Sequence, residues 1–127
     1  MKNTESISYY EDKEHIEQII SILKKYSYGE LRKRDYFSYS LMEKNTDEEM
    51  LEKYYPQFDR IRLIAYRERA GKQPNYDIYY ETDEGFAVIF AIDINKSPPV
   101  LVNAFSFNKN LKNFMKFAVK KYGDKMI

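Results

Sequence analysis

Two arginines and a lysine stand close together in the stretch AYRERAGKQPNYDIYY, residues 65–80. Arg67 and Arg69 follow an apolar run, and Lys72 lies in the Gly-Lys-Gln-Pro sequence after them. Residues 60–72 carry a net charge of +4 in a chain whose total charge is +1. A guanidinium matches two phosphate oxygens, and a lysine whose pKa is lowered by nearby cations can transfer a proton. The stretch therefore predicts an anion-binding site, with ordinary solvated turn residues as the alternative.

The remaining composition excludes several kinds of chemistry. His15 is the single histidine and stands among charged residues, so a Ser-His-Asp set is not expected. The four glycines lack the spacing of a phosphate-binding loop, and there is no cysteine to bind a metal. Arginine, lysine, tyrosine, serine and asparagine near strand ends remain, and these side chains can support metal-independent cleavage of RNA. We therefore expect neither a metal nor a cofactor.

The charge of the chain is segregated along the sequence. Residues 108–127 carry a net charge of +5, whereas residues 1–59 and 73–107 each carry −4. If the basic segments 60–72 and 108–127 meet in space, they form a patch that attracts an anion. The alternative is that these charges coat solvent-facing surfaces without a common role.

Helical periodicity appears at three places in the chain. A helix is predicted over residues 11–27 from apolar residues at helical spacing, which are Ile16, Ile19, Ile20 and Leu23. Residues 31–45 could form a second helix or a strand, and their partial alternation favours an irregular segment with some strand. Thr46 and Glu49 form a capping box that predicts a short helix over residues 46–55. The third helix, over residues 109–122, is predicted from Leu111, Phe114, Met115 and Ala118.

Four strands with short connections are predicted between the second and third helices, over residues 60–67, 76–81, 86–94 and 100–107. Alternation places Ile61, Leu63 and Ala65 on one face of the first strand. The strand at 86–94 is apolar on both faces, which is typical of a central strand. We therefore expect an α+β fold, with an antiparallel sheet of four or five strands packed against the N-terminal and C-terminal helices.

Length and hydropathy set the expected class of protein. The chain of 127 residues predicts one domain spanning residues 1–127, large enough to bury its own core. The longest apolar run, residues 86–92, is too short to cross a bilayer. The first residues lack the apolar segment of a secretion signal, and the absence of cysteine fits a reducing compartment. A cytoplasmic protein without membrane contact is expected.

The second half of the chain resembles small ribonuclease toxins of the RelE/HigB type. These belong to a group with barnase, colicin D and related nuclease domains of bacteria and phages. The similar stretches are FAVIFAIDINKSPPVLVNAFSFNKN, the helix LKNFMKFAVKKYGD, and the strand and turn RERAGKQPNYDIYY. The resemblance covers residues 62–125. Phe107 and Asn108 stand where these toxins often have lysines, and residues 1–59 have no counterpart.

The resemblance implies a metal-independent endoribonuclease and a role for each matching residue. The residues implied in catalysis are Arg67, Arg69, Lys72 and Ser106. The residues implied in nucleic-acid binding are Arg62, Asn103, Lys109 and Lys112. In this interpretation the arginines clamp the scissile phosphate, Lys72 stabilises charge or transfers a proton, and the lysines of the closing helix hold flanking phosphates. The partner would be RNA.

A protein-binding module without catalysis is the main alternative, such as an immunity protein, an antitoxin or an inhibitor. Its partner would be a cognate protein, and the near-neutral charge, the acidic N-terminal half and the 13 tyrosines favour it. A weaker third hypothesis is a small-ligand pocket lined by Phe86, Phe90 and Tyr80. Convergence of Arg67, Arg69 and Lys72 with Ser106 and the closing helix on one open concave surface would favour the nuclease. Pairing of these residues with Asp77, Glu81 or the carboxylates of the N-terminal half would count against it.

Overall fold

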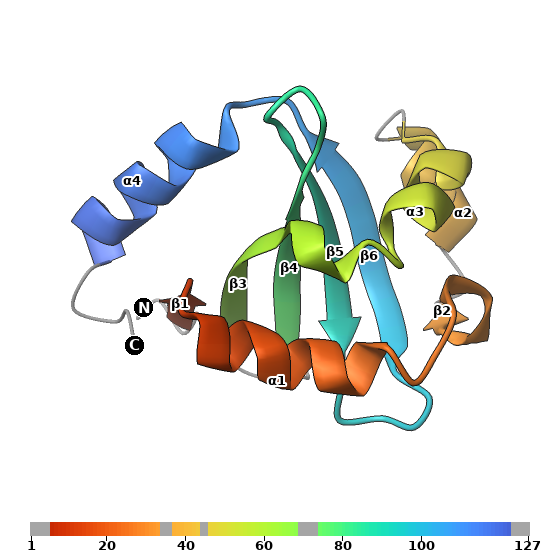
Figure 1. Ribbon diagram of the computed structural model, residues 1–127. Coiled ribbons are helices and arrows are strands. Elements are labelled where there is room, and N and C mark those ends of the chain that lie inside the picture. The colour runs from red at the N-terminus through yellow and green to blue at the C-terminus, as the bar shows by residue number, and fades with distance from the viewer. Residues whose placement is uncertain (1–5, 34–36, 44–45, 69–73, 123–127) are drawn as a thin grey trace, which may run out of the picture.

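The computed structural model describes residues 6–33, 37–43, 46–68 and 74–122. Its α+β fold confirms the predicted class (Figure 1). The strands form one sheet in the order β1-β3-β4-β5-β6-β2, antiparallel except for the parallel pair β2–β6. The strands are β1 (Ser6–Tyr10), β2 (Arg32–Lys33), β3 (Ile61–Glu68), β4 (Asn75–Glu81), β5 (Ala87–Asp93) and β6 (Val100–Phe107). The helices are α1 (Lys13–Leu23), α2 (Phe37–Glu43), α3 (Glu48–Tyr54), α4 (Leu111–Tyr122), and the 3-10 helices η1 (Tyr28–Glu30) and η2 (Phe58–Arg60).

The four predicted strands correspond to β3, β4, β5 and β6, and the sheet gains one more strand at each edge. The mostly antiparallel arrangement is confirmed, but six strands replace the expected four or five. β2 is only two residues long and pairs in parallel with Val100 and Leu101 of β6. A pair of residues is too short to show alternation, so this strand left no pattern to recognise.

The predicted N-terminal helix is confirmed as α1, which begins later and ends earlier than predicted. Its first N–H groups are capped by Asp12. The carboxylate of Asp12 accepts a hydrogen bond from the backbone N of His15 at 3.1 Å. Residues 31–45 include a strand, as expected, in β2, but the interpretation of the rest as irregular was wrong over Phe37–Glu43, which is the helix α2. The predicted cap of α3 moves by one residue, because Asp47 rather than Thr46 accepts from the backbone N of Glu49, at 3.0 Å.

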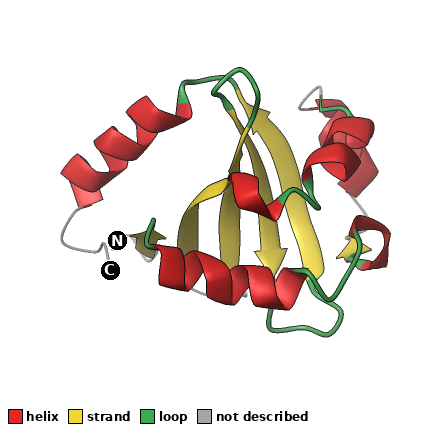
Figure 2. Cartoon of the chain, viewed as in Figure 1, coloured by secondary structure: helices red, strands yellow, loops and turns green. Residues whose placement is uncertain are grey.

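Helices α1 and α3 cover one side of the sheet, which we call the front face; it carries Ile64, Ile78 and Phe90 (Figure 2). Its core is rich in aromatic rings, because Phe90 contacts Tyr28, Tyr55 and Tyr80 at centroid distances of 6.5, 5.9 and 5.0 Å. The buried hydroxyls are satisfied by backbone oxygens: Tyr55 donates to Leu23 at 3.0 Å and Tyr80 donates to Tyr55 at 2.8 Å. Burial of apolar rings with paired hydroxyls stabilises this layer.

Helix α4 packs on the other side of the sheet, which we call the back face; it carries Leu63, Tyr79 and Ile89. Phe114 of α4 stacks on Tyr79 at 5.6 Å. The helix begins at Leu111, which is fully buried and donates its backbone N–H to the backbone oxygen of Gly85 at 2.8 Å. The turn before β5 and the start of α4 are therefore held together.

The predicted alternation of β3 is broken near its start. Ile61 lies in the front core together with Ile64, whereas Leu63 and Ala65 lie in the back core. The pairing of β3 with β4 shifts register between Ile61 and Leu63. An extra residue in one strand reverses the faces on which the following side chains lie. Ile61 was therefore wrongly grouped with Leu63 and Ala65.

Candidate functional site

Arg67 lies near the end of β3 on the back face and pairs with a buried carboxylate. Its Nε donates to Oδ2 of Asp77 at 2.9 Å, and Oδ1 of Asp77 accepts from Nδ2 of Asn75 at 2.9 Å. The side chain of Asp77 is 10% exposed and that of Arg67 is 28% exposed. The guanidinium thus supplies the positive charge that a carboxylate in this buried position requires.

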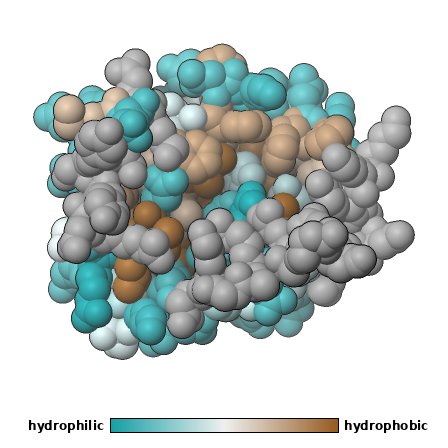
Figure 3. Space-filling view, turned by 180° about the vertical axis from the view of Figure 1, so that it is seen from behind, coloured by the Kyte–Doolittle hydropathy of each residue, from teal (hydrophilic) through white to brown (hydrophobic). Residues whose placement is uncertain are grey.

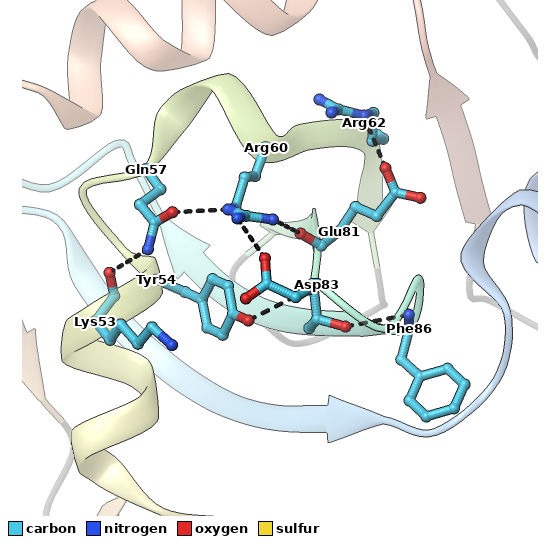
Figure 4. A network of polar contacts seen from close by, with 9 residues as sticks. Lys53, Tyr54, Gln57, Arg60, Arg62, Glu81, Asp83 and Phe86 are labelled. Carbon is cyan, nitrogen blue, oxygen red and sulfur yellow. Dashed lines mark hydrogen bonds and ion pairs between the residues drawn. The ribbon is translucent and has the colours of Figure 1, made fainter.

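Arg60, just before β3, and Arg62, near its start, also donate hydrogen bonds to oxygen atoms of the same chain (Figure 4). Arg60 donates to the side chains of Gln57 at 2.7 Å and Asp83 at 2.5 Å, and to the backbone oxygen of Glu81 at 3.1 Å. Arg62 donates to the Glu81 carboxylate at 3.2 Å. These contacts fix the turn after β4 to the segment before β3.

The arginine contacts change the electrostatics of the predicted anion site. Within residues 60–68, each of the three arginines contacts a carboxylate of the same chain. A phosphate would have to displace that carboxylate, which is costly for the mostly buried Arg67–Asp77 pair and less so for the more exposed pairs of Arg60 and Arg62. Arg69 and Lys72, the other two cations of the basic segment, lie outside the described residues.

Ser106 and Arg67 lie at opposite ends of the sheet. Ser106 pairs with Val88, Val88 pairs with Tyr80, and Tyr80 pairs with Ile61. Arg67 is six residues farther along β3 than Ile61, a separation of about 20 Å along the strand. Ser106 alternates with Phe105 and Phe107, which pack on the back face, so its side chain is on the front face. The structure does not bring these two candidate catalytic residues together.

Asn103 shares the back face with Arg67. In the sheet it pairs with Ala91, which pairs with Asp77, so the backbones of Asn103 and Asp77 are about 10 Å apart. The Oδ1 of Asn103 accepts a hydrogen bond from the backbone N of Ala104 at 2.9 Å. The side-chain oxygen of Asn103 is therefore hydrogen-bonded within β6. Its amide nitrogen is the atom that could still serve the predicted role of orienting a nucleotide.

Lys109 and Lys112 lie at the Ser106 end of the sheet, before α4 and in its first turn. Both are exposed, and neither pairs with a carboxylate in the part of the chain that the structure describes. The exposed side of α4 also carries Lys116 and Phe117, and Phe117 is 52% exposed. Sequence reasoning missed Phe117, although it falls outside the helical spacing of the buried residues.

Raised pKa values make six tyrosines of the described residues poor groups for proton transfer. Lys33, whose pKa is lowered, lies on β2, at the edge of the sheet far from β3. Burial is the main cause of a raised pKa at six tyrosines, which are Tyr28, Tyr55, Tyr66, Tyr76, Tyr79 and Tyr80. Burial lowers the pKa of Lys33. Its Nζ donates to the backbone oxygens of Tyr28 at 3.0 Å and Leu31 at 3.3 Å. Tyr28 in turn donates to the Glu48 carboxylate at 2.9 Å, so an acidic side chain adjoins this lysine.

Other kinds of site find little support in the described ranges. These residues include no group of three or more histidine and carboxylate side chains placed to hold a metal ion. Tyr80 and Phe90 are fully buried in the front core, so they do not line the open ligand pocket of the third hypothesis. Among the helices of these ranges, none is both long and apolar enough to cross a membrane.

Comparisons with known proteins do not add a family. No model of a known protein family matches the chain, and no curated protein or solved structure matches it. The function must therefore be argued from the contacts described above.

Proposed function

We propose that the protein acts by binding another protein, without catalysis of its own. The observation that carries this proposal is the pairing of Arg60, Arg62 and Arg67 with carboxylates of the same chain. Arginines held in this way position parts of the fold, and they are poorly available to clamp a phosphate. The large distance between Arg67 and Ser106 also supports a role without catalysis.

The surface of the back side supports binding to a protein. Phe105, Phe107, Phe114 and Met115 are only partly buried against the back core, and Phe117 is more exposed still. Figure 3 shows hydrophobic residues gathered across the upper part of this side, with hydrophilic residues around them. Aromatic side chains that remain accessible are common anchors of protein interfaces.

Affinity purification from source cells tests this proposal directly. The full chain should retain a defined protein after nuclease treatment, identified by mass spectrometry and recovered in a fixed ratio. Recovery of no protein with the wild-type chain would contradict the proposal. Protein that leaves the column when RNA is digested would contradict it as well, because binding would then be indirect.

Metal-independent cleavage of RNA is the second candidate, favoured by Lys109 and Lys112, which are exposed and pair with no carboxylate among the described residues. Labelled RNA incubated with the purified protein in EDTA tests it. We expect no cleavage beyond that of buffer alone. Cleavage that disappears in an Arg67→Ala variant, while the variant keeps its folded circular dichroism spectrum, would establish the nuclease and overturn the binding proposal.

A further inference from the structure

We infer that one end of the front face, where β1, β3, β4 and the start of α1 meet, binds an arginine-containing segment of a partner protein. The inference rests on the proposed protein-binding function and names a second surface, away from the back face, together with the chemistry of its partner. We call this surface the tyrosine edge; it consists of Tyr10, His15, Tyr66, Glu68 and Tyr76.

The three tyrosines of the tyrosine edge gather on neighbouring strands. Tyr66 of β3 pairs with Tyr76 of β4 in the sheet, and the centroids of their rings are 4.9 Å apart. Burial is the main cause of the raised pKa of Tyr76, and the hydroxyl of Tyr10 adds to it, so Tyr10 lies close to this pair. Helix α1 begins beside β1 and crosses this part of the front face (Figure 1). All three tyrosines are partly exposed and so contribute to the surface.

The first turn of α1 holds the ring of Tyr10 in place. His15 stacks on Tyr10 at a centroid distance of 4.4 Å. The Nδ1 of His15 is 2.6 Å from Oδ2 of Asp12, so the imidazole is fixed between the tyrosine ring and the carboxylate. A ring that is already held in position loses little conformational entropy when a partner binds to it.

Carboxylates around the tyrosine edge are not neutralised by the chain itself. Glu11, Glu14 and Glu68 are exposed, and none of them forms an ion pair within the described residues. Glu68 accepts a hydrogen bond from the hydroxyl of Tyr66 at 3.2 Å, which places its charge beside the aromatic rings. The Oδ1 of Asp12 is shielded from solvent and lacks a hydrogen-bond partner in the described chain. The surface therefore favours a ligand that brings positive charge and N–H donors.

Arginine matches this combination of rings and carboxylates better than any other side chain. Its guanidinium is planar, donates several N–H bonds to carboxylates and stacks on the rings of tyrosines. A lysine ammonium pairs with carboxylates but has no plane to lie on an aromatic ring. The expected partner is therefore a protein segment with exposed arginines.

A nucleic acid is a poor match to the tyrosine edge, although residues 60–72 carry a net charge of +4. Arg67 follows Tyr66 in the sequence but lies on the back face, where a carboxylate holds it. Arg60 and Arg62 are at the other end of β3, about 13 Å or more from Tyr66 along the strand. The exposed glutamates beside the tyrosines repel phosphate groups, so the local charge favours a cation.

NMR titration of the isotope-labelled full chain tests the inference. The probe is a peptide of repeating Gly-Arg-Gly-Ser, compared with repeating Gly-Lys-Gly-Ser and repeating Gly-Glu-Gly-Ser. We expect the arginine peptide to shift the amide signals of Tyr10, Tyr66 and Tyr76, and to bind at least about threefold more tightly than the lysine peptide. The glutamate peptide should not bind. Equal binding of the lysine peptide, or arginine-peptide shifts confined to other parts of the chain, would overturn the inference.

Two variants locate the binding at the tyrosine edge. Glu68→Gln removes an exposed charge and Tyr66→Leu removes a ring, and each should weaken binding of the arginine peptide at least about threefold. The matched controls are Glu52→Gln in α3 and Tyr26→Leu after α1, at an exposed and a partly exposed position. Circular dichroism verifies the fold of each variant, and Glu68→Gln suffices if Tyr66→Leu does not fold. Equal losses in the controls would contradict the assignment.

Two other occupants of the tyrosine edge are outcomes of the same experiments. Arg69 and Lys72 lie outside the described residues, so oligouridylate is titrated as well. Oligouridylate that shifts the same tyrosine signals and binds more tightly than the arginine peptide would assign the surface to nucleic acid. Self-association in sedimentation velocity that is lost in Glu68→Gln would assign it to a second copy of the chain. Either result would overturn the inference.

Affinity purification separates the inference from the proposed function. If the wild-type chain and Glu68→Gln recover the same protein in the same amount, and the arginine peptide does not bind, protein binding stands and the tyrosine edge is excluded. If the arginine peptide binds at the tyrosines but the wild-type chain recovers no protein from source cells, the proposed function fails while the binding chemistry of the surface stands.

Discussion

The two faces of the sheet are built from different side chains, although they share the same strands. The front face is a layer of aliphatic residues and aromatic rings, covered by α1 and α3. The back face is apolar where α4 packs, and farther along it carries Arg67, Asn75 and Asp77. The front face therefore accounts for most of the apolar burial, and the back face combines stability with an accessible surface.

The largest expected difference appears at alkaline pH, where several buried tyrosines act together. Burial raises the pKa of Tyr55 and Tyr80 on the front face and of Tyr79 on the back face above the ordinary value of 10.0. A raised folded pKa contributes stability that is complete below pH 10 and is lost as the pH rises above it.

Thermal unfolding followed by circular dichroism, together with tyrosinate absorbance, measures this effect. The melting temperature should fall steeply above pH 10, with tyrosinate appearing during unfolding. Ionisation of all 13 tyrosines near pH 10 while the protein remains folded would show that these hydroxyls are not buried. Tyr55→Phe should reduce the slope of this fall.

The second prediction compares one ring on each face. Phe90→Ala on the front face should destabilise the protein by about 3–5 kcal/mol, because Phe90 is fully buried among aromatic neighbours. Phe105→Ala on the back face, at a partly buried position, should cost about half as much. Urea unfolding curves measure both. Equal losses would mean that the back face is packed as tightly as the front.

The third prediction compares two arginine–carboxylate pairs. Arg67→Ala should destabilise the protein by about 2 kcal/mol, a value reduced from that of a fully buried pair because Arg67 is partly exposed. The matched control is Arg62→Ala, whose partner is the less deeply buried Glu81, and its cost should be about 0.5 kcal/mol. Urea unfolding at neutral pH measures both, and the reverse order would contradict the structural role given to Arg67.

The smallest expected effect is at the turn between β4 and β5. Gly85 has a positive φ of 85°, which a residue with a Cβ adopts at a cost. Gly85→Ala should destabilise the protein by about 1 kcal/mol, and space is not the reason, since the nearest atom to an added Cβ would be 3.8 Å away. A Gly85→Asn variant should lose less, because asparagine tolerates this backbone conformation. Thermal unfolding distinguishes the two variants.

The parts of the fold with a clear period were predictable from the sequence. The strands β3 to β6 and the helices α1, α3 and α4 follow from alternation, helical spacing and capping residues. β1 was missed, although Ile7 and Tyr9 alternate with serines in its sequence SISYY. Five residues beside the charged start of α1 give only a weak signal for a strand. It is the pairing with β3 that makes this segment a strand.

The candidate site was less predictable, because it depends on which residues meet across strands. The sequence marked Arg67 as a cation, but its partnership with Asp77 depends on the register of β3 against β4. The excess charge of residues 60–72 likewise did not reveal that Arg60 and Arg62 hold Asp83 and Glu81. The net charge of residues 60–72 includes only the charges within that segment, whereas the carboxylates of Glu81 and Asp83 lie beyond it in the sequence.

The position of β1 has a consequence for the order of folding. Ser6 pairs with Glu68 and Tyr10 pairs with Ile64, so β1 joins the sheet only after a long loop closes. β4, β5 and β6 pair with strands that are next to them in the chain, at a smaller entropic cost. We therefore expect β1 to dock late in folding and to detach first in the native state. Amide hydrogens of β1 should exchange with solvent much faster than those of β5, whose seven residues are all buried.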